Sequence, residues 1–100
     1  MLPYVFHPLA ATELDEAVGH YEAIQLGKGL ELARQIQAAI EQVCKFPESA
    51  PVACGSVRSI VVQPASRWSY TVHYRYKPDG IRVLAIAHQN RQPFYWFGRR

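Results

Sequence analysis

The spacing of apolar residues changes near the middle of this 100-residue chain, and that change limits the possible folds more than any other feature. In residues 8–46 apolar side chains recur every three or four positions, as in amphipathic helices. In residues 57–87 they are β-branched or alternate with polar side chains, as in strands. The sequence therefore predicts an α+β protein in which a helical part precedes a sheet-forming part.

The first half predicts a short strand and two helices. Tyr4–Phe6 has the composition of a strand, and Pro8 stands where its fixed φ suits a first helical position. This helix should end at the Gly27-Lys28-Gly29 break, and a second should run from about Leu30 to Phe46, because Pro47 forces a stop. Two helices with so short a break form an antiparallel hairpin.

The second half predicts a loop over residues 47–56 and then three strands, at about 57–62, 68–76 and 81–87. Residues 77–80, Lys-Pro-Asp-Gly, form the turn between the last two strands. The last strand is almost entirely apolar, which predicts burial on both faces and an interior position. We therefore expect one domain over residues 1–100 with the order β-α-α-β-β-β. The helical hairpin should pack on one face of a small antiparallel-rich sheet of about four strands.

Charge is divided between the two halves. Residues 1–50 carry seven acids and three bases, a balance of −4, whereas residues 51–100 carry eight bases and one acid, a balance of +7. A basic sheet beside less basic helices can present one charged face to nucleic acid, to an acidic protein segment or to both.

Several classes of protein are not favoured. No apolar run approaches the roughly 20 residues of a membrane helix, and the N-terminus does not resemble a secretion signal, so we expect a cytoplasmic protein. Cys44 and Cys54 do not have the spacing of metal ligands, and the four histidines add none. No metal and no cofactor is expected.

Several landmarks, in this order, resemble the RelE/ParE superfamily, and most of all the ParE-type plasmid-stabilisation toxins of bacterial type II toxin–antitoxin modules. They are Phe6-His7-Pro8-Leu9-Ala10-Ala11-Thr12-Glu13-Leu14, Phe46-Pro47, Val57-Arg58, Tyr70-Thr71-Val72-His73-Tyr74 and Ile81 to His88 followed by Arg91, Pro93, Tyr95 and Trp96. The resemblance implies a twisted sheet with an N-terminal helical hairpin. It also implies a small antitoxin whose acidic or partly disordered C-terminal segment wraps the toxin and neutralises it.

The resemblance leaves three functions open. ParE-type members are understood to inhibit DNA gyrase by binding, and RelE-type members are ribosome-dependent endoribonucleases that cleave mRNA. The third possibility is an accessory member that binds its antitoxin without being toxic. Two positions where the nuclease pattern has a basic residue align here with Thr71 and with Asn90, or with the adjacent Arg91 after a one-residue shift. Arg58 has no second basic residue after it. These departures favour gyrase inhibition over nuclease activity.

The candidate site residues lie in the basic second half. A nuclease would use His88, Arg91, Tyr95 and Arg58 as its catalytic set. The candidates for target or antitoxin binding are Arg58, His73, Arg75, Arg91, Tyr95, Trp96, Arg99 and Arg100.

For several of these residues a structural role is the alternative. His88 would then be a strand-end histidine bonded to a loop carbonyl, and His73 and Arg75 would be the exposed side of a strand. Residues 93–100 would pack their aromatic side chains against the sheet edge and leave a frayed, charged end.

Overall fold

The computed structural model describes residues 1–100, and its elements follow the predicted order with one additional strand. Strand β1 (Tyr4–Phe6) leads into helices α1 (Pro8–Ile24) and α2 (Lys28–Lys45). The remaining strands are β2 (Val52–Cys54), β3 (Val57–Val61), β4 (Tyr70–Lys77) and β5 (Gly80–His88).

The helical hairpin is fixed by capping at the start of each helix. Nδ1 of His7 accepts a hydrogen bond from the backbone N–H of Leu9 at 3.1 Å, and Pro8 follows as the first helical residue. At the turn, the Glu22 carboxylate accepts hydrogen bonds from the N–H groups of Gly27 and Gly29, each at 3.0 Å. These bonds stabilise the N-terminus of α2, which begins at Lys28, two residues earlier than predicted.

The sheet contains five strands in the order β1-β5-β4-β3-β2, so the expectation of about four strands was wrong. The unpredicted strand is β2, which lies inside the segment 47–56 that was expected to be a loop. It is three residues long and pairs with β3 beside Arg58 and Val57. Strand β1 pairs with β5 in parallel and all other pairs are antiparallel.

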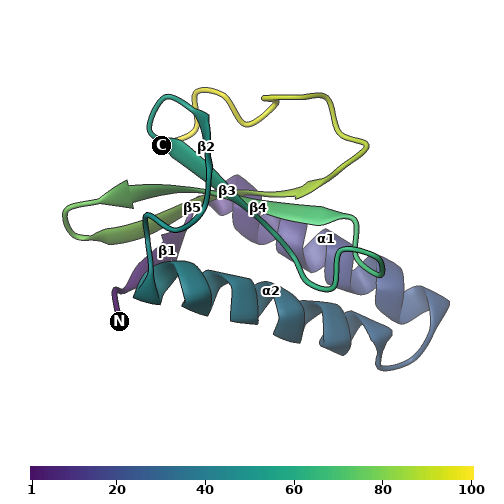
Figure 1. Cartoon of the computed structure of the whole chain (residues 1–100). Coiled ribbons are helices and arrows are strands. Elements are labelled where there is room, and N and C mark those ends of the chain that lie inside the picture. Colours follow the sequence, from purple (N-terminus) through teal and green to yellow (C-terminus); the bar gives the residue numbers. More distant parts are fainter.

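Helices α1 and α2 cover one face of the sheet, as predicted (Figure 1). The core between the two layers contains 17 buried residues, centred on Leu32, Ile36 and Ile40 of α2 and Val72 and Tyr74 of β4. Strand β5 lies between β1 and β4, and residues 81–87 are buried except at position 82, which confirms the predicted interior strand.

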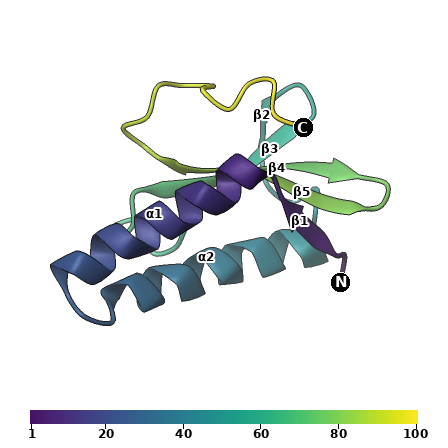
Figure 2. The same cartoon turned by 180° about the vertical axis from the view of Figure 1, so that it is seen from behind.

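The other face of the sheet carries the end of the chain. After β5, residues 89–100, called the tail below, loop back over the sheet on the side away from the helices; the view from behind in Figure 2 shows the same arrangement. The sheet face beneath it is called the tail face. None of the helices combines the length and apolar character needed to cross a membrane.

Candidate functional site

The tail holds its shape through a series of tight turns. Backbone hydrogen bonds run from Arg91 to His88 (2.9 Å), from Tyr95 to Gln92 (3.3 Å), from Phe97 to Phe94 (2.9 Å) and from Arg99 to Trp96 (3.1 Å). Gly98 adopts a φ of 92°, a left-handed conformation that glycine reaches without strain. The tail is therefore an ordered loop and not the frayed end considered above.

Trp96 anchors the tail to the sheet. Its side chain is 3% exposed and packs in a small cluster with Val57, Leu84 and Ala85 of the tail face. Its ring also lies 4.9 Å from that of His73, at an interplanar angle of 30°. Trp96 therefore packs on the sheet face, whereas the structural alternative placed the aromatic side chains at the sheet edge.

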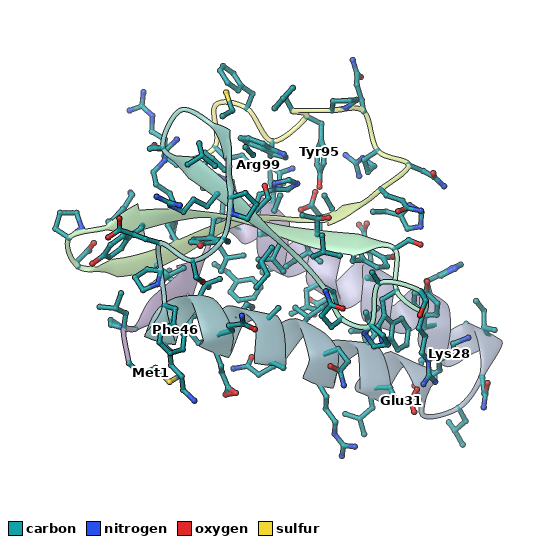
Figure 3. All side chains as sticks on the ribbon, in the orientation of Figure 1. Met1, Lys28, Glu31, Phe46, Tyr95 and Arg99 are labelled. Atoms are coloured by element: carbon teal, nitrogen blue, oxygen red, sulfur yellow. The ribbon has the colours of Figure 1, made fainter.

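A second anchor joins the tail to α1. The guanidinium of Arg99 donates two hydrogen bonds to the carboxylate of Glu13, Nη1 to Oε1 at 3.0 Å and Nη2 to Oε2 at 3.1 Å. Glu13 also accepts from the N–H of Ile86 at 3.1 Å, and Arg99 Nη1 donates to the carbonyl of Leu84 at 2.9 Å. Figure 3 shows Arg99 and Tyr95 over the sheet at this end of the tail. Arg99 is therefore a structural cation more than a free binding residue.

Tyr95 contacts two arginines. The guanidinium carbon of Arg91 is 4.0 Å from the centre of the tyrosine ring, and that of Arg99 is 5.1 Å away. The tyrosine hydroxyl is buried near Glu13 but has no partner in hydrogen-bonding geometry. Burial, followed by the proximity of the Glu13 carboxylate, raises the pKa of Tyr95 well above its usual range. This hydroxyl therefore stays protonated at neutral pH and cannot serve as a base.

His73 lies beneath Trp96 on the tail face and is partly buried, so the expectation of an exposed strand face does not describe it well. Its Nδ1 is 2.6 Å from the hydroxyl oxygen of Ser59, the residue opposite it on β3. Burial lowers the pKa of His73 to about 4, although the Glu13 carboxylate acts in the opposite direction. His73 is consequently a neutral imidazole at physiological pH.

One cavity of about 210 Å³ brings several of the candidate residues together. It is lined by His88, Arg91 and Tyr95, together with His73 and Thr71 of β4. Nδ1 of His88 accepts a hydrogen bond from the N–H of Asn90 at 3.0 Å. His88 thus bonds to a loop N–H, whereas the structural alternative had assumed a loop carbonyl.

Arg58 is separate from this group. Its neighbours Val57 and Ser59 face the tail, whereas Arg58 faces the helix side, where its Nη1 donates to the carbonyls of Ala50 (2.7 Å) and Glu48 (3.1 Å). Its Nη2 also lies 4.0 Å from the Glu48 carboxylate. Arg58 therefore holds the 48–50 loop, and the four residues of the nuclease set do not meet at one site.

The two remaining candidates are basic residues of the tail side. Arg75 lies on the tail face of β4 opposite Val57, and Arg100 is exposed at the end of the tail. No group of three or more His, Cys, Asp or Glu side chains is arranged to hold a metal ion.

Sequence reasoning missed Glu13 and Ser59 as parts of this site. Glu13 was the acid of the N-terminal motif, but nothing in the sequence connected it with Arg99, which is 86 positions away. A signal for Ser59 was present, because serine is the one polar uncharged residue in a β-branched strand. Pairing it with His73 required the register of β3 and β4.

Comparison with known proteins decides the family. The sequence matches the family model described as "ParE toxin of type II toxin-antitoxin system, parDE" over residues 4–93. The chain belongs to the ParE toxin family. This confirms the resemblance to ParE-type toxins that the sequence landmarks suggested.

A solved structure has the same fold as this ParE-family chain. It is described as "Chromosomal ParDE TA system from P. aeruginosa", and the matching chain has a TM-score of 0.67 and 24% sequence identity. The match covers 88% of this chain and 96% of the other. A search of curated proteins found no match.

Proposed function

We propose that this ParE-family toxin inhibits DNA gyrase by binding it, and that a cognate antitoxin neutralises the toxin. The observation that carries the proposal is that the tail is fixed over the tail face and exposes aromatic rings. Trp96 and the Arg99–Glu13 ion pair fix the tail over the sheet, and Phe94 and Phe97 remain 50% and 72% exposed. Exposed aromatic rings on a rigid support are typical of protein-binding surfaces.

The distribution of the polar groups supports binding over catalysis. RNA cleavage needs a base for the 2′-hydroxyl, an acid for the leaving oxygen and cations for the developing charge. Here Arg58 bonds to the 48–50 loop on the opposite face, and the Tyr95 hydroxyl is buried next to Glu13. His88 and Arg91 alone do not supply the complete set.

A groove beside α2 supports an antitoxin partner. It has a volume of about 430 Å³ and runs between α2 and the segments 49–51 and 59–63. Small and apolar residues, among them Ala38, Ala39, Ala50 and Ile60, form much of its lining, and no charged residue contributes to it. Such a groove suits an apolar segment that orders on binding, while the basic second half attracts acidic side chains.

The test is induction of the chain alone in growing bacteria, with incorporation of labelled thymidine and labelled methionine followed separately. We expect thymidine incorporation to fall first, and purified chain to inhibit supercoiling by gyrase. Phe97→Ser should weaken both effects, whereas Leu26→Ser, a change at a 90% exposed residue of the α1–α2 turn, should weaken neither. DNA gyrase acts in the cytoplasm, so this function requires the chain to act in the cytoplasm.

A ribosome-dependent endoribonuclease is the second candidate, because His88, Arg91 and Tyr95 share one cavity. In that case methionine incorporation should collapse first, and His88→Ala should abolish toxicity without affecting antitoxin binding. Growth that continues normally after induction would contradict both toxic functions and leave the accessory, antitoxin-binding role.

A further inference from the structure

We propose that Arg75 and Arg82, which lie side by side at one end of the tail face, form a phosphate-binding site, with Lys77 and Arg100 at its rim. The site is distinct from the cavity lined by His88 and Arg91. It goes beyond the proposed gyrase and antitoxin functions and does not depend on either of them.

The register of the sheet brings the two arginines together. Arg75 of β4 is directly opposite Arg82 of β5, and Val57 and Val5 are the next residues of the same row, on β3 and β1. Residues opposite each other on neighbouring strands point to the same face, and like charges in that position destabilise a sheet. The pair therefore lowers the stability of the fold, which is expected where a site has another role.

No acidic side chain neutralises these cations. The three ion pairs of the structure involve Arg58, Arg67 and Arg99, and none involves Arg75, Lys77, Arg82 or Arg100. Arg82 donates from Nε to the main-chain oxygen of Arg100, the last residue of the sequence, at 3.0 Å, and makes a long contact of 3.4 Å to the carbonyl of Phe6. The Nε atom of Arg75 is buried and has no hydrogen-bond partner. A buried donor without a partner is unfavourable.

A cavity adjoins Arg82, the β5 member of the pair. It has a volume of about 240 Å³ and its charged lining consists of Lys77, Arg82 and Arg100 with the single acid Asp79. That volume is about eight times the share of one water molecule in the liquid, so a phosphate group and several waters fit.

The arrangement favours phosphate over a carboxylate. The two oxygens of a carboxylate are saturated by one guanidinium fork, whereas a phosphate group has further oxygens for a second fork. The Asp79 carboxylate already lines this cavity, yet it forms no ion pair with any of the cations. A carboxylate at this place is therefore not strongly bound by them. The phosphate would come from a nucleic-acid backbone or from a free phosphate compound.

The first experiment is NMR of the intact chain with the arginine side-chain Nε–H signals resolved, during titration with inorganic phosphate. We expect saturable shifts of the Arg75 and Arg82 signals, and no shift of Arg34, an exposed arginine of α2 without an ion pair. Unchanged Arg75 and Arg82 signals, or equal shifts at Arg34, would overturn the proposal.

Titration with a short oligothymidylate then distinguishes the sources of phosphate. Tighter binding than that of inorganic phosphate assigns the site to a nucleic-acid backbone, and equal or weaker binding assigns it to a free phosphate compound; both results support a phosphate site. An oligoglutamate that binds the same two arginines more tightly than either phosphate probe overturns it in favour of an acidic protein segment.

Variants test the site without relying on one substitution. The affinities are measured with whichever phosphate probe binds more tightly. The double variant Arg75→Gln/Arg82→Gln should lower the affinity for that probe at least about tenfold, because charge-assisted hydrogen bonds are worth roughly 1.5 kcal/mol or more. Arg34→Gln should leave it unchanged. Arg75→Lys keeps the charge and removes the fork, so a few-fold loss is expected there even if the double variant folds poorly. Equal affinities for all variants would overturn the proposal.

Discussion

Glu13 and Arg99 are 86 positions apart in the sequence, and their side chains form an ion pair in which each is little more than one-tenth exposed. This pair connects the first helix to the end of the tail. The same carboxylate accepts a hydrogen bond from the backbone of β5, so one acidic side chain joins three parts of the fold.

Replacing Glu13 should cost the protein much of its stability. Glu13→Gln leaves the Arg99 guanidinium buried without a counter-charge, and removing one member of a buried pair costs about 3–5 kcal/mol. Urea unfolding followed by circular dichroism measures the loss. The matched control is Glu31→Gln, because Glu31 pairs with Arg67 at the surface, where such pairs contribute at most about 1 kcal/mol. Equal losses for both variants would contradict the role assigned to Glu13.

Stability should depend on pH through His73. The pKa of His73 is about 4 in the folded chain, and in the unfolded chain it returns to the ordinary value of 6.5. Between these two pH values the unfolded chain therefore binds more protons than the folded chain. The free energy of unfolding should therefore be fully maintained above pH 6.5 and fall as the pH decreases toward 4, by up to about 1.4 kcal/mol per pH unit. His73→Gln should flatten this slope relative to wild type. His20→Gln, at an exposed histidine of α1, should not.

Removing the tail anchor should release the tail. Trp96→Ala deletes a buried ring whose loss costs about 3 kcal/mol or more. If this cost falls on the attached tail, the fraction of molecules with the tail detached from the sheet rises about a hundredfold. Trypsin should then cleave after Arg91 and Arg99 much faster than in the wild type, as limited proteolysis with mass spectrometry would show. Phe97→Ala alters an exposed ring of the same tail and should leave the cleavage rate nearly unchanged. Equal rates in the two variants would mean that Trp96 does not hold the tail.

Replacing each of two helical glycines with alanine should change the stability of the protein in opposite directions. A Cβ at Gly29 would lie 2.4 Å from the carbonyl oxygen of Val18, so Gly29→Ala should force the helices apart and cost about 1–3 kcal/mol. Gly19 has nothing within 4 Å of the added atom, and Gly19→Ala should raise stability by about 0.5–1 kcal/mol. Thermal unfolding of the two variants side by side tests both signs.

Local signals in the sequence were enough to predict the main elements of the fold. Pro8 and Pro47 mark where the helical region begins and stops, and the alternation in β4 and the apolar run in β5 identify two strands and an interior position. Strand β2 was missed because three residues between Pro51 and Gly55 give too short a pattern. Its pairing with β3 makes it a strand, and pairing is a tertiary property.

The site was less predictable because its key contacts are long-range. The aromatic and basic composition of the tail marked it as important, but composition could not tell that Trp96 would be buried on a sheet face or that Arg99 would pair with Glu13. The same reasoning grouped Arg58 with His88, although Arg58 bonds to the 48–50 loop and the His88 ring packs against Tyr70 at the end of β5. Alternation along β3 assigns Arg58 to its face only once the direction of Val57 or Ser59 is known.

The parallel pairing of β1 with β5 also has a consequence for synthesis on the ribosome. Strand β1 can pair with β5 only after residues 81–83 have emerged from the ribosome. Glu13 can form its ion pair only later still, after Arg99 has emerged. A chain still being translated therefore lacks both its finished sheet and its tail surface. The tail surface can therefore form only after Arg99 has left the ribosome.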